Sequence, residues 1–393
     1  MKRIFLILCW ALYDLANQFF ALNIVSLYFV RWLTLEKRAP EILYSLSFGI
    51  STFFVAILGT ILGIASDVSG RRKPHLIWLT LISVIFTMLL GIKESVFINL
   101  IFFAIANFGC QAAVVFYNSL MVNIAPRSKF GLVSGLGKAF GYSGAILALF
   151  LIKPIVLRSG YRATFLPTGI LFLLFSLPCL IFVKDKIKPA SVKNAPFNPA
   201  AFPGLADFLK AAFCGLAAVN AIILFMSVYA TRVFGLNEAQ VINLIGFSTL
   251  FAIVGSFLSG FLSDYLGHKR CLLWVFILWS LCFLFGAVVK NVTWYWFIGG
   301  LVGIVLGSTW VVSRSLAISL VPEERTGEIF GLFNFVGYLS AIVGAVFWGV
   351  MVWLLKPMGE LGYRITLFSL VIFTVPGFIF LLRVPKDKCA TKL

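Results

Sequence analysis

Long apolar segments alternate with short polar connections along the whole chain. Each segment has roughly the 20 residues that a helix rising 1.5 Å per residue needs to cross a membrane. A backbone in lipid must satisfy its own hydrogen bonds, and segments of this length are too long for barrel strands. The pattern predicts an all-α membrane protein with twelve transmembrane helices. The predicted segments lie at 4–33, 43–66, 75–92, 96–124, 131–152, 164–183, 208–233, 241–264, 271–289, 294–320, 331–355 and 364–382.

The composition excludes several classes of protein. Hydrophobic residues make up 61% of the 393 residues and charged residues 12%, against about 45–50% and about 25% in an ordinary soluble domain. A soluble enzyme, a disulfide-rich secreted scaffold and a disordered chain are therefore excluded. The net charge of +18 could indicate a nucleic-acid partner, but Lys and Arg stand in short groups between apolar segments and form no continuous basic face. We expect the lipid bilayer, and no nucleic acid, as a partner.

The connections differ in positive charge. Lys and Arg are more frequent in the connections on the side of both termini, and an excess of these residues marks the cytoplasmic side. The sequence thus predicts a multi-pass protein with both termini in the cytoplasm, and its compact connections indicate a bacterial inner membrane. The longest connection, 184–207, has four prolines and no helical period, which predicts a linker. It separates a first half at 1–183 from a second half at 208–393, which ends in a short cytoplasmic tail.

The two halves repeat each other. The stretch from Gly63 to Lys73 recurs as the stretch from Gly260 to Arg270. Later in each half, Asn118-Ser119-Leu120 recurs as Arg314-Ser315-Leu316, in the same order and at nearly the same offset. The halves are therefore predicted to be parallel six-helix repeats, the arrangement in which substrate sites form between halves near the bilayer midplane.

The repeated motifs carry a resemblance. The paired Gly-x-x-x-Asp-x-x-Gly loops, each followed by cations, resemble the signature loop of the major facilitator superfamily, and the match covers the whole chain. The stretches from Trp10 to Asn17, Phe116 to Asn118 and Ser313 to Leu316 are similar to the branch of vacuolar amino-acid effluxers linked to autophagy and their bacterial relatives. The resemblance implies two pseudo-symmetric six-helix bundles and secondary active transport by alternating access.

Asp14 is the first candidate for function. It lies about ten residues into the first segment, roughly 15 Å deep at 1.5 Å per residue. A carboxylate there costs about 2.5–3.5 kcal/mol on insertion scales, so its presence needs a reason. We predict a proton-coupling or substrate-amine site with Asn17 and Tyr13 beside it; a structural ion pair to a neighbouring helix is the alternative. The equivalent stretch of the seventh segment ends at Asn220 and has no acid.

Two cations inside the predicted segments, Lys138 and Arg314, are the next candidates. Each lies about seven residues, or roughly 10 Å, from the cytoplasmic end of its segment, and either could snorkel. The resemblance implies a cavity lined by segments 1, 4, 7 and 10, which includes Arg314 and its repeat counterpart Asn118. Structural pairing near the cytoplasmic side is the alternative for Lys138. An acid and an arginine would suit a zwitterion such as an amino acid, or they would pair with each other.

Two acidic residues at segment ends form the third group. A carboxylate beside the start of another helix gains about 0.3–1 kcal/mol. By the resemblance, Asp67 should reach the start of the eleventh segment near 327–330, and Asp264 the start of the fifth near 129–132. These contacts would form a cytoplasmic gate, although the cations could act only as topology signals on anionic lipid. The predicted gate residues are Asp67, Gly70, Arg71, Arg72, Asp264, Gly267 and Lys269.

Six aromatic residues near these candidates have two interpretations. They could line a cavity, but in a chain with 42 Phe an aromatic stripe more often faces lipid, which is our expectation. The six are Trp10, Tyr13, Phe19, Phe20, Phe116 and Tyr117.

The sequence has no phosphate-binding glycine loop with Lys and Ser or Thr, no cluster of metal ligands and no nucleophile motif. We expect no enzyme activity, no cofactor and no metal, and transport driven by gradients. The prediction is a monomeric secondary transporter that exports a small polar or zwitterionic solute, amino acids first, with protons as a coupling partner. Two alternatives stay open. One is an exporter of amphipathic drugs or lipids, and the other a non-transporting receptor or scaffold in which Asp14 pairs with Arg314.

Overall fold

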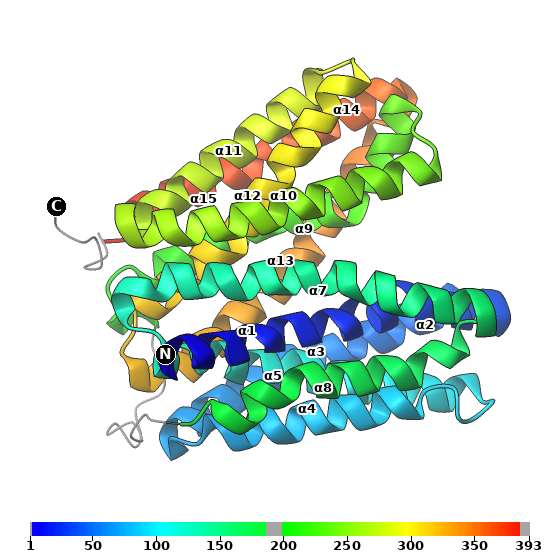
Figure 1. The fold of residues 1–393 in the computed structure, drawn as a ribbon. Coiled ribbons are helices and arrows are strands. Elements are labelled where there is room, and N and C mark those ends of the chain that lie inside the picture. The colour runs from blue at the N-terminus through cyan, green and yellow to red at the C-terminus, as the bar shows by residue number, and fades with distance from the viewer. Residues whose placement is uncertain (1, 186–198, 386–393) are drawn as a thin grey trace. The chain divides into compact units, whose positions relative to one another are not determined.

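A computed structural model describes residues 2–185 and 199–385, and helices dominate both ranges (Figure 1). The helices of the first range are α1 (Lys2–Phe20), α2 (Tyr28–Arg31), α3 (Glu41–Ser69), α4 (Arg72–Leu89), α5 (Val96–Ser119), α6 (Met121–Ile124), α7 (Phe130–Ser159) and α8 (Phe165–Phe182). The helices of the second range are α9 (Leu205–Phe234), α10 (Glu238–Leu266), α11 (His268–Val288), α12 (Val292–Ser319), α13 (Thr326–Leu354), α14 (Glu360–Ser369) and α15 (Val371–Arg383). Two π-helical stretches, Ala21–Leu27 and Trp32–Glu36, continue the first segment beyond α1.

Eleven helical segments of the described ranges are long and apolar enough to cross a membrane. The all-α membrane fold predicted from the apolar pattern is confirmed, but the count of twelve is not. The predicted segment at 75–92 corresponds to α4, which has 18 residues and begins with Arg72, Lys73 and, two residues later, His75. Because these polar residues occupy its first turn, α4 has too little apolar length to be among the eleven membrane-crossing segments.

Helix ends follow local sequence signals. The Ser95 hydroxyl accepts the backbone N–H of Ile98 at the start of α5, and Asn237 and Gln240 form a reciprocal capping box at the start of α10. At the end of α3, Gly70 adopts a left-handed conformation with φ 67°, which a residue with a side chain rarely takes. These local signals determine at which residues the helices begin and end.

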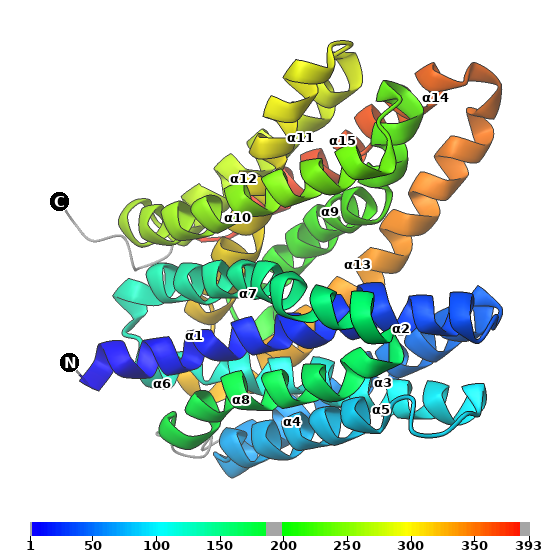
Figure 2. The ribbon, with the colours of Figure 1, turned by 45° about the vertical axis from the view of Figure 1, so that its right-hand side comes forward.

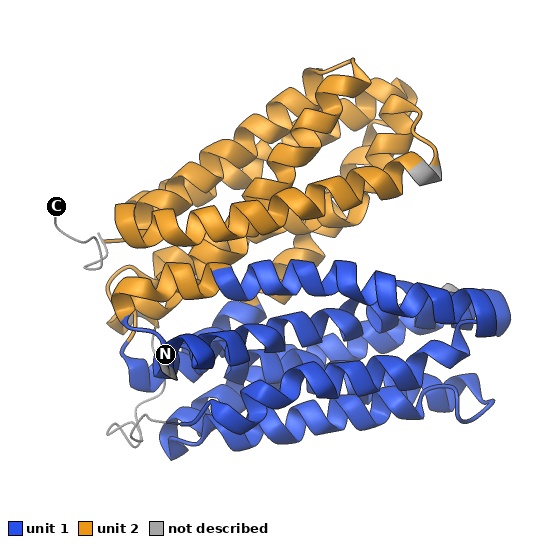
Figure 3. Ribbon diagram, in the orientation of Figure 1, with its two compact units in different colours: residues 1–126, 136–195, 322–335 blue, residues 127–135, 196–321, 336–393 orange. Residues whose placement is uncertain are grey.

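The chain divides into two compact units (Figure 3). The first comprises residues 1–126, 136–195 and 322–335, and the second comprises 127–135, 196–321 and 336–393. The start of α13 thus belongs with the helices of the first half of the sequence, and the start of α7 with those of the second half. The boundaries predicted at 183 and 208 stay a prediction.

In the first unit, α1 packs on α8, α5 packs on α3 and α4, and α4 packs on α8 (Figure 2). Its core is rich in aromatic rings. Phe29 stacks on Phe103 with ring centroids 5.0 Å apart, and Trp32 meets Phe165 edge-on at 5.6 Å. These rings and Phe20 are almost fully buried, so this part of the unit is a packed apolar core.

Carboxylates join three connections at one end of the first unit. Glu94, which follows α4, pairs with Lys37 and, at 2.9 Å, with Arg162. Glu36 accepts the backbone N–H of Tyr161 at 3.3 Å. The hydrogen bond from Lys37, and then the charges of Lys37 and Arg162, lower the pKa of the Glu94 carboxyl. The carboxylate therefore keeps its charge and its partners when the pH falls toward the ordinary pKa of a glutamate.

In the second unit, α10 packs on α12, α9 on α15, and α11 on both α12 and α15. Polar side chains link these helices inside the apolar packing. The Trp279 indole donates to the Thr309 hydroxyl at 2.8 Å, and the Tyr229 hydroxyl donates to the Gly286 carbonyl at 2.8 Å. These two hydrogen bonds link α11 to α12 and α9 to α11 within the core.

Candidate functional site

Asp14 and Lys138 form an ion pair between α1 and α7 inside the first unit. The Lys138 Nζ lies 3.2 Å from Asp14 Oδ1. The Asp14 side chain is 5% exposed and the Lys138 side chain 25% exposed. Both residues were candidates, and the structure brings them together. A carboxylate at this depth thus has a positive charge beside it, which offsets part of the cost of removing it from water.

Glycines on one face of α7 let α1 approach closely. A Cβ at Gly137 would lie 2.6 Å from the Trp10 ring, and one at Gly144 would lie 2.6 Å from the Leu15 carbonyl oxygen. Between them, a Cβ at Gly141 would stand 3.6 Å from the Asp14 carboxyl carbon. The spacing of these glycines matches one helical face, and it places the Asp14 backbone close enough to α7 for Lys138 to reach the carboxylate.

The aromatic residues beside Asp14 are buried, so the expectation that they face lipid is wrong. Tyr117 stacks on Trp10 and on Tyr13, with ring centroids 4.5 and 4.9 Å apart. The Trp10 indole donates to the Tyr117 carbonyl at 2.9 Å, and the Tyr13 and Thr80 hydroxyls lie 2.6 Å apart. Interior packing, with the polar tips of Trp10 and Tyr13 hydrogen-bonded, explains these side chains better than contact with lipid. At most 1% of each of the six is exposed: Trp10, Tyr13, Phe19, Phe20, Phe116 and Tyr117.

The remaining predicted site residues lie on several helices. Asn17 is buried on α1, where its side-chain amide oxygen accepts a hydrogen bond from the Cys110 thiol at 3.8 Å. Asn118 is buried in the last turn of α5. Arg314, buried on α12, and Asn220, half-buried on α9, belong to the second unit. The roles of these four residues stay predictions, as does the pairing of Asp14 with Arg314.

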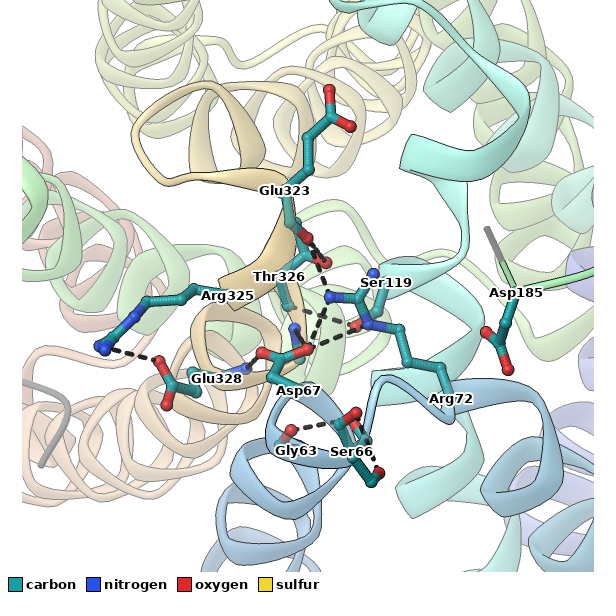
Figure 4. Close-up of polar contacts among 12 residues, drawn as sticks. Gly63, Ser66, Asp67, Arg72, Ser119, Asp185, Glu323, Arg325, Thr326 and Glu328 are labelled. Carbon is teal, nitrogen blue, oxygen red and sulfur yellow. Dashed lines mark hydrogen bonds and ion pairs between the residues drawn. The ribbon is translucent and has the colours of Figure 1, made fainter. Parts of the chain in front are cut away.

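A first latch holds the start of α13 (Figure 4). Asp67, near the end of α3, accepts the backbone N–H groups of Gly327 and Glu328 at 3.1 and 2.8 Å. Arg72 donates to the same carboxylate from Nε and Nη2 at 3.0 and 2.6 Å. The contact predicted between Asp67 and this helix start is therefore present. We call Asp67, Arg72 and these two amides the first latch.

Further contacts tie the first latch to the segment that leads into α13. Arg72 Nη2 also donates to the Glu323 carbonyl at 2.9 Å, and the Ser119 hydroxyl donates to the Thr326 carbonyl at 3.2 Å. A Cβ at Gly63 would lie only 2.5 Å from the Gly327 carbonyl oxygen. The backbones of α3 and α13 therefore touch where the carboxylate meets the positive end of the helix dipole.

A second latch repeats this arrangement in the second unit. Asp264, near the end of α10, accepts the backbone N–H groups of Gly131 and Leu132 at 2.6 and 2.7 Å. A Cβ at Gly260 would lie 2.5 Å from the Gly131 carbonyl oxygen. This contact was also predicted and is present. We call Asp264 and these two amides the second latch.

The cations and glycines of the predicted gate take different places. Gly70 ends α3 with φ 67°, and Gly267 ends α10 with φ 95°. Arg71 is exposed. Lys269 donates to the carbonyls of Leu382, at 2.9 Å, and Val384, so it ties α11 to the end of α15. Lys269 therefore serves the second unit's helix packing and does not donate to Asp264.

Two further residues lie at the latches, and neither was among the predicted gate residues. Glu328, whose N–H enters the first latch, is buried and pairs with Arg325 at 3.4 Å. His268, the first residue of α11, is fully buried beside the second loop. The signal for His268 was Lys269 in the second loop, which aligns with Lys73 once one residue of the first loop is skipped.

The comparisons with known proteins decide the family. The sequence matches the model of the Major Facilitator Superfamily over residues 6–345 and again over 208–390. The chain belongs to this superfamily. Its members carry small molecules across membranes, and this transporter is therefore a multi-pass membrane protein and not an enzyme.

Relatives and solved structures agree with this membership. The transporter is 27% identical to an uncharacterized protein of Aquifex aeolicus (strain VF5) over 384 residues, 97% of each chain. It is 25% identical to an uncharacterized MFS-type transporter, YxiO, of Bacillus subtilis (strain 168) over 412 residues, 96% of this chain and 94% of the relative. A crystal structure of a bacterial homologue of the iron transporter ferroportin, in its outward-facing state, matches with a TM-score of 0.78. It is 13% identical over 97% of this chain and 98% of that one, so it supports the fold alone.

Proposed function

We propose that this chain is a secondary active transporter that exports a small polar or zwitterionic solute, amino acids first, by alternating access. The observation that carries the proposal is the Asp14–Lys138 ion pair inside a membrane-crossing segment. A buried ion pair adds little stability compared with apolar packing of the same volume. Ionisable groups at membrane depth instead mark the paths of substrates and protons.

The chemistry of the pair fits an amine-bearing cargo and a coupled proton. The carboxylate of Asp14 already binds one ammonium group, that of Lys138. A substrate ammonium group can replace it, and a proton on the carboxylate would free the lysine. The resemblance of the stretch from Trp10 to Asn17 to amino-acid effluxers supports the same cargo class. Stacking of the nearby aromatic rings with one another, rather than around an opening, disfavours the export of amphipathic drugs or lipids.

We further infer that the two latches close the transporter on its cytoplasmic side, where both termini lie. Each latch holds a helix start by two backbone hydrogen bonds to one carboxylate. Contacts of this kind can break and re-form without unfolding a helix, because the first amides of a helix have no partner within it. The transporter is proposed to work as a monomer in a bacterial inner membrane, with protons as the coupling partner.

Replacing Asp14 with asparagine is expected to abolish the response of transport to a pH gradient, because an amide neither binds nor releases the coupled proton. Metabolites that accumulate in cells lacking the gene identify the cargo, and flux of that cargo is then measured in proteoliposomes with and without a gradient. Asp207→Asn is the matched control, since Asp207 stands in the first turn of α9 near Lys210. Unchanged coupling in the Asp14 variant contradicts the proton role, and absence of flux in the unaltered protein favours the receptor or scaffold.

A further inference from the structure

The two latches share a layout but differ in charge. The Asp67 carboxylate accepts two backbone N–H groups from the start of α13 and two more hydrogen bonds from Arg72. Within residues 2–185 and 199–385, the Asp264 carboxylate accepts two backbone N–H groups from the start of α7 and has no ion pair. The first latch therefore contains a buried cation and the second latch does not.

The helix starts show which residue takes the place of Arg72 in the second half. Arg72 is the first residue of α4, and His268 is the first residue of α11. The next residue matches as well: the Lys73 amine donates to a carbonyl near the end of α8, and the Lys269 amine to one near the end of α15. The second loop is thus one residue shorter, and His268 corresponds to Arg72. Both side chains are at most 2% exposed.

An arginine and a histidine differ at this position in charge, in hydrogen-bond donors and in reach. The guanidinium group is always charged and has five donors in a planar fork, whereas an imidazole has two ring nitrogens and a shorter reach. Arg72 uses that reach to bind the Asp67 carboxylate and the Glu323 carbonyl together. It therefore joins α3 to the segment that enters α13, in addition to neutralising the carboxylate.

We propose that the second latch is the weaker of the two because His268 stands where the first latch has Arg72, so that the start of α7 is released more often than the start of α13. Charge-assisted hydrogen bonds are stronger than neutral ones, and the first latch has two more of them than the second. The difference lies in one residue of each loop. The proposal concerns the same latches as the cytoplasmic gate, but it does not depend on transport.

The amides of the latches report this difference directly. The first backbone N–H groups of a helix have no acceptor within the helix. Protection of the amides of Gly327 and Glu328 from hydrogen exchange therefore depends on Asp67, and protection of the amides of Gly131 and Leu132 depends on Asp264. Exchange in the segments 323–330 and 127–135 measures how often each latch is open.

The experiment is hydrogen exchange, followed by mass spectrometry, of the full chain in lipid nanodiscs. After correction for intrinsic rates, segment 127–135 is expected to exchange about tenfold faster than segment 323–330. His268→Arg should slow exchange in 127–135 by about tenfold and leave 323–330 unchanged. Arg72→His should speed exchange in 323–330 by a similar factor and leave 127–135 unchanged. Two opposite changes, each confined to one segment, are the result expected if an arginine at this helix start strengthens its latch.

Two controls separate this role from general effects. His268→Gln adds no charge and should leave both segments as in the unaltered protein. Arg158→His removes an exposed arginine at the far end of α7 and should also change neither segment. If both segments move together in any variant, or if the two segments of the unaltered protein exchange equally, the proposal is wrong. Should His268→Arg fail to fold, the Arg72→His variant decides: unchanged exchange in 323–330 overturns the proposal. If the exchange pattern is as expected but no flux is measured, the result contradicts the proposed transport function and leaves the proposal on the latches standing.

Discussion

Replacing Gly63 with alanine is expected to open the first latch and to lower transport by about fivefold or more. The new Cβ would lie 2.5 Å from the Gly327 carbonyl oxygen, a backbone atom that cannot move aside as the end of a flexible side chain can. The helices α3 and α13 must therefore separate, and Asp67 loses its two amides. Overpacking of this kind costs about 1–3 kcal/mol, and each 1.4 kcal/mol is a factor of about ten in an equilibrium. Hydrogen exchange in segment 323–330 and flux in proteoliposomes measure the two effects.

The same helix offers a matched control. Gly49 also lies in α3, but a Cβ there would meet nothing within 4 Å. Gly49→Ala should leave the latch and the flux unchanged, and it should raise helix stability by up to about 1 kcal/mol. In the second unit, Gly260→Ala and Gly246→Ala form the equivalent pair, because Gly260 faces the Gly131 carbonyl and Gly246 faces open space. Equal behaviour of Gly63→Ala and Gly49→Ala would rule out close backbone contact as the basis of the latch.

The latch contacts were predictable because they depend on a short, repeated motif. Asp67 and Asp264 each stand three residues before a glycine that ends a helix, and the motif occurs once in each half. Such a motif fixes local geometry, and the resemblance supplied the partner helix. The residue that differs between the two latches was harder to find. A loop one residue shorter shifts His268 into the place of Arg72, and a sequence comparison without a gap pairs His268 with Arg71 instead.

The surroundings of Asp14 were less predictable. A depth of ten residues in an apolar segment identifies the carboxylate but not the helix that it faces, because the rotation of α1 depends on packing against its neighbours. The glycines at 137, 141 and 144 held the missing signal, since their spacing marks the face of α7 that admits α1. The aromatic residues were misplaced for a similar reason. A high overall count of Phe favours lipid contact on average, whereas Trp10 and Tyr117 are fixed by a stack and a hydrogen bond in the interior.

Replacing Lys138 with methionine should destabilise the protein by about 3 kcal/mol. Methionine keeps the unbranched side chain except for its last atom, and it leaves the Asp14 carboxylate without the ammonium 3.2 Å away. Breaking a buried ion pair by removing one partner costs about 3–5 kcal/mol, and the lower figure applies because a quarter of the Lys138 side chain is exposed. Denaturant unfolding of the purified protein measures the change. Lys153→Met, at an exposed position of the same helix, is the control and should stay within about 0.5 kcal/mol.

Combining Lys138→Met with Asp14→Asn separates the structural role of the pair from its proposed role in transport. The double variant should recover most of the lost stability, because an amide has no charge to leave unpaired. Its flux should nevertheless stay insensitive to a pH gradient, since the group proposed to bind the proton is gone. A double variant as unstable as the sum of the two single variants would show that the ion pair does not account for the stability effect. A stable double variant that keeps its response to pH would place the coupled proton elsewhere in the chain.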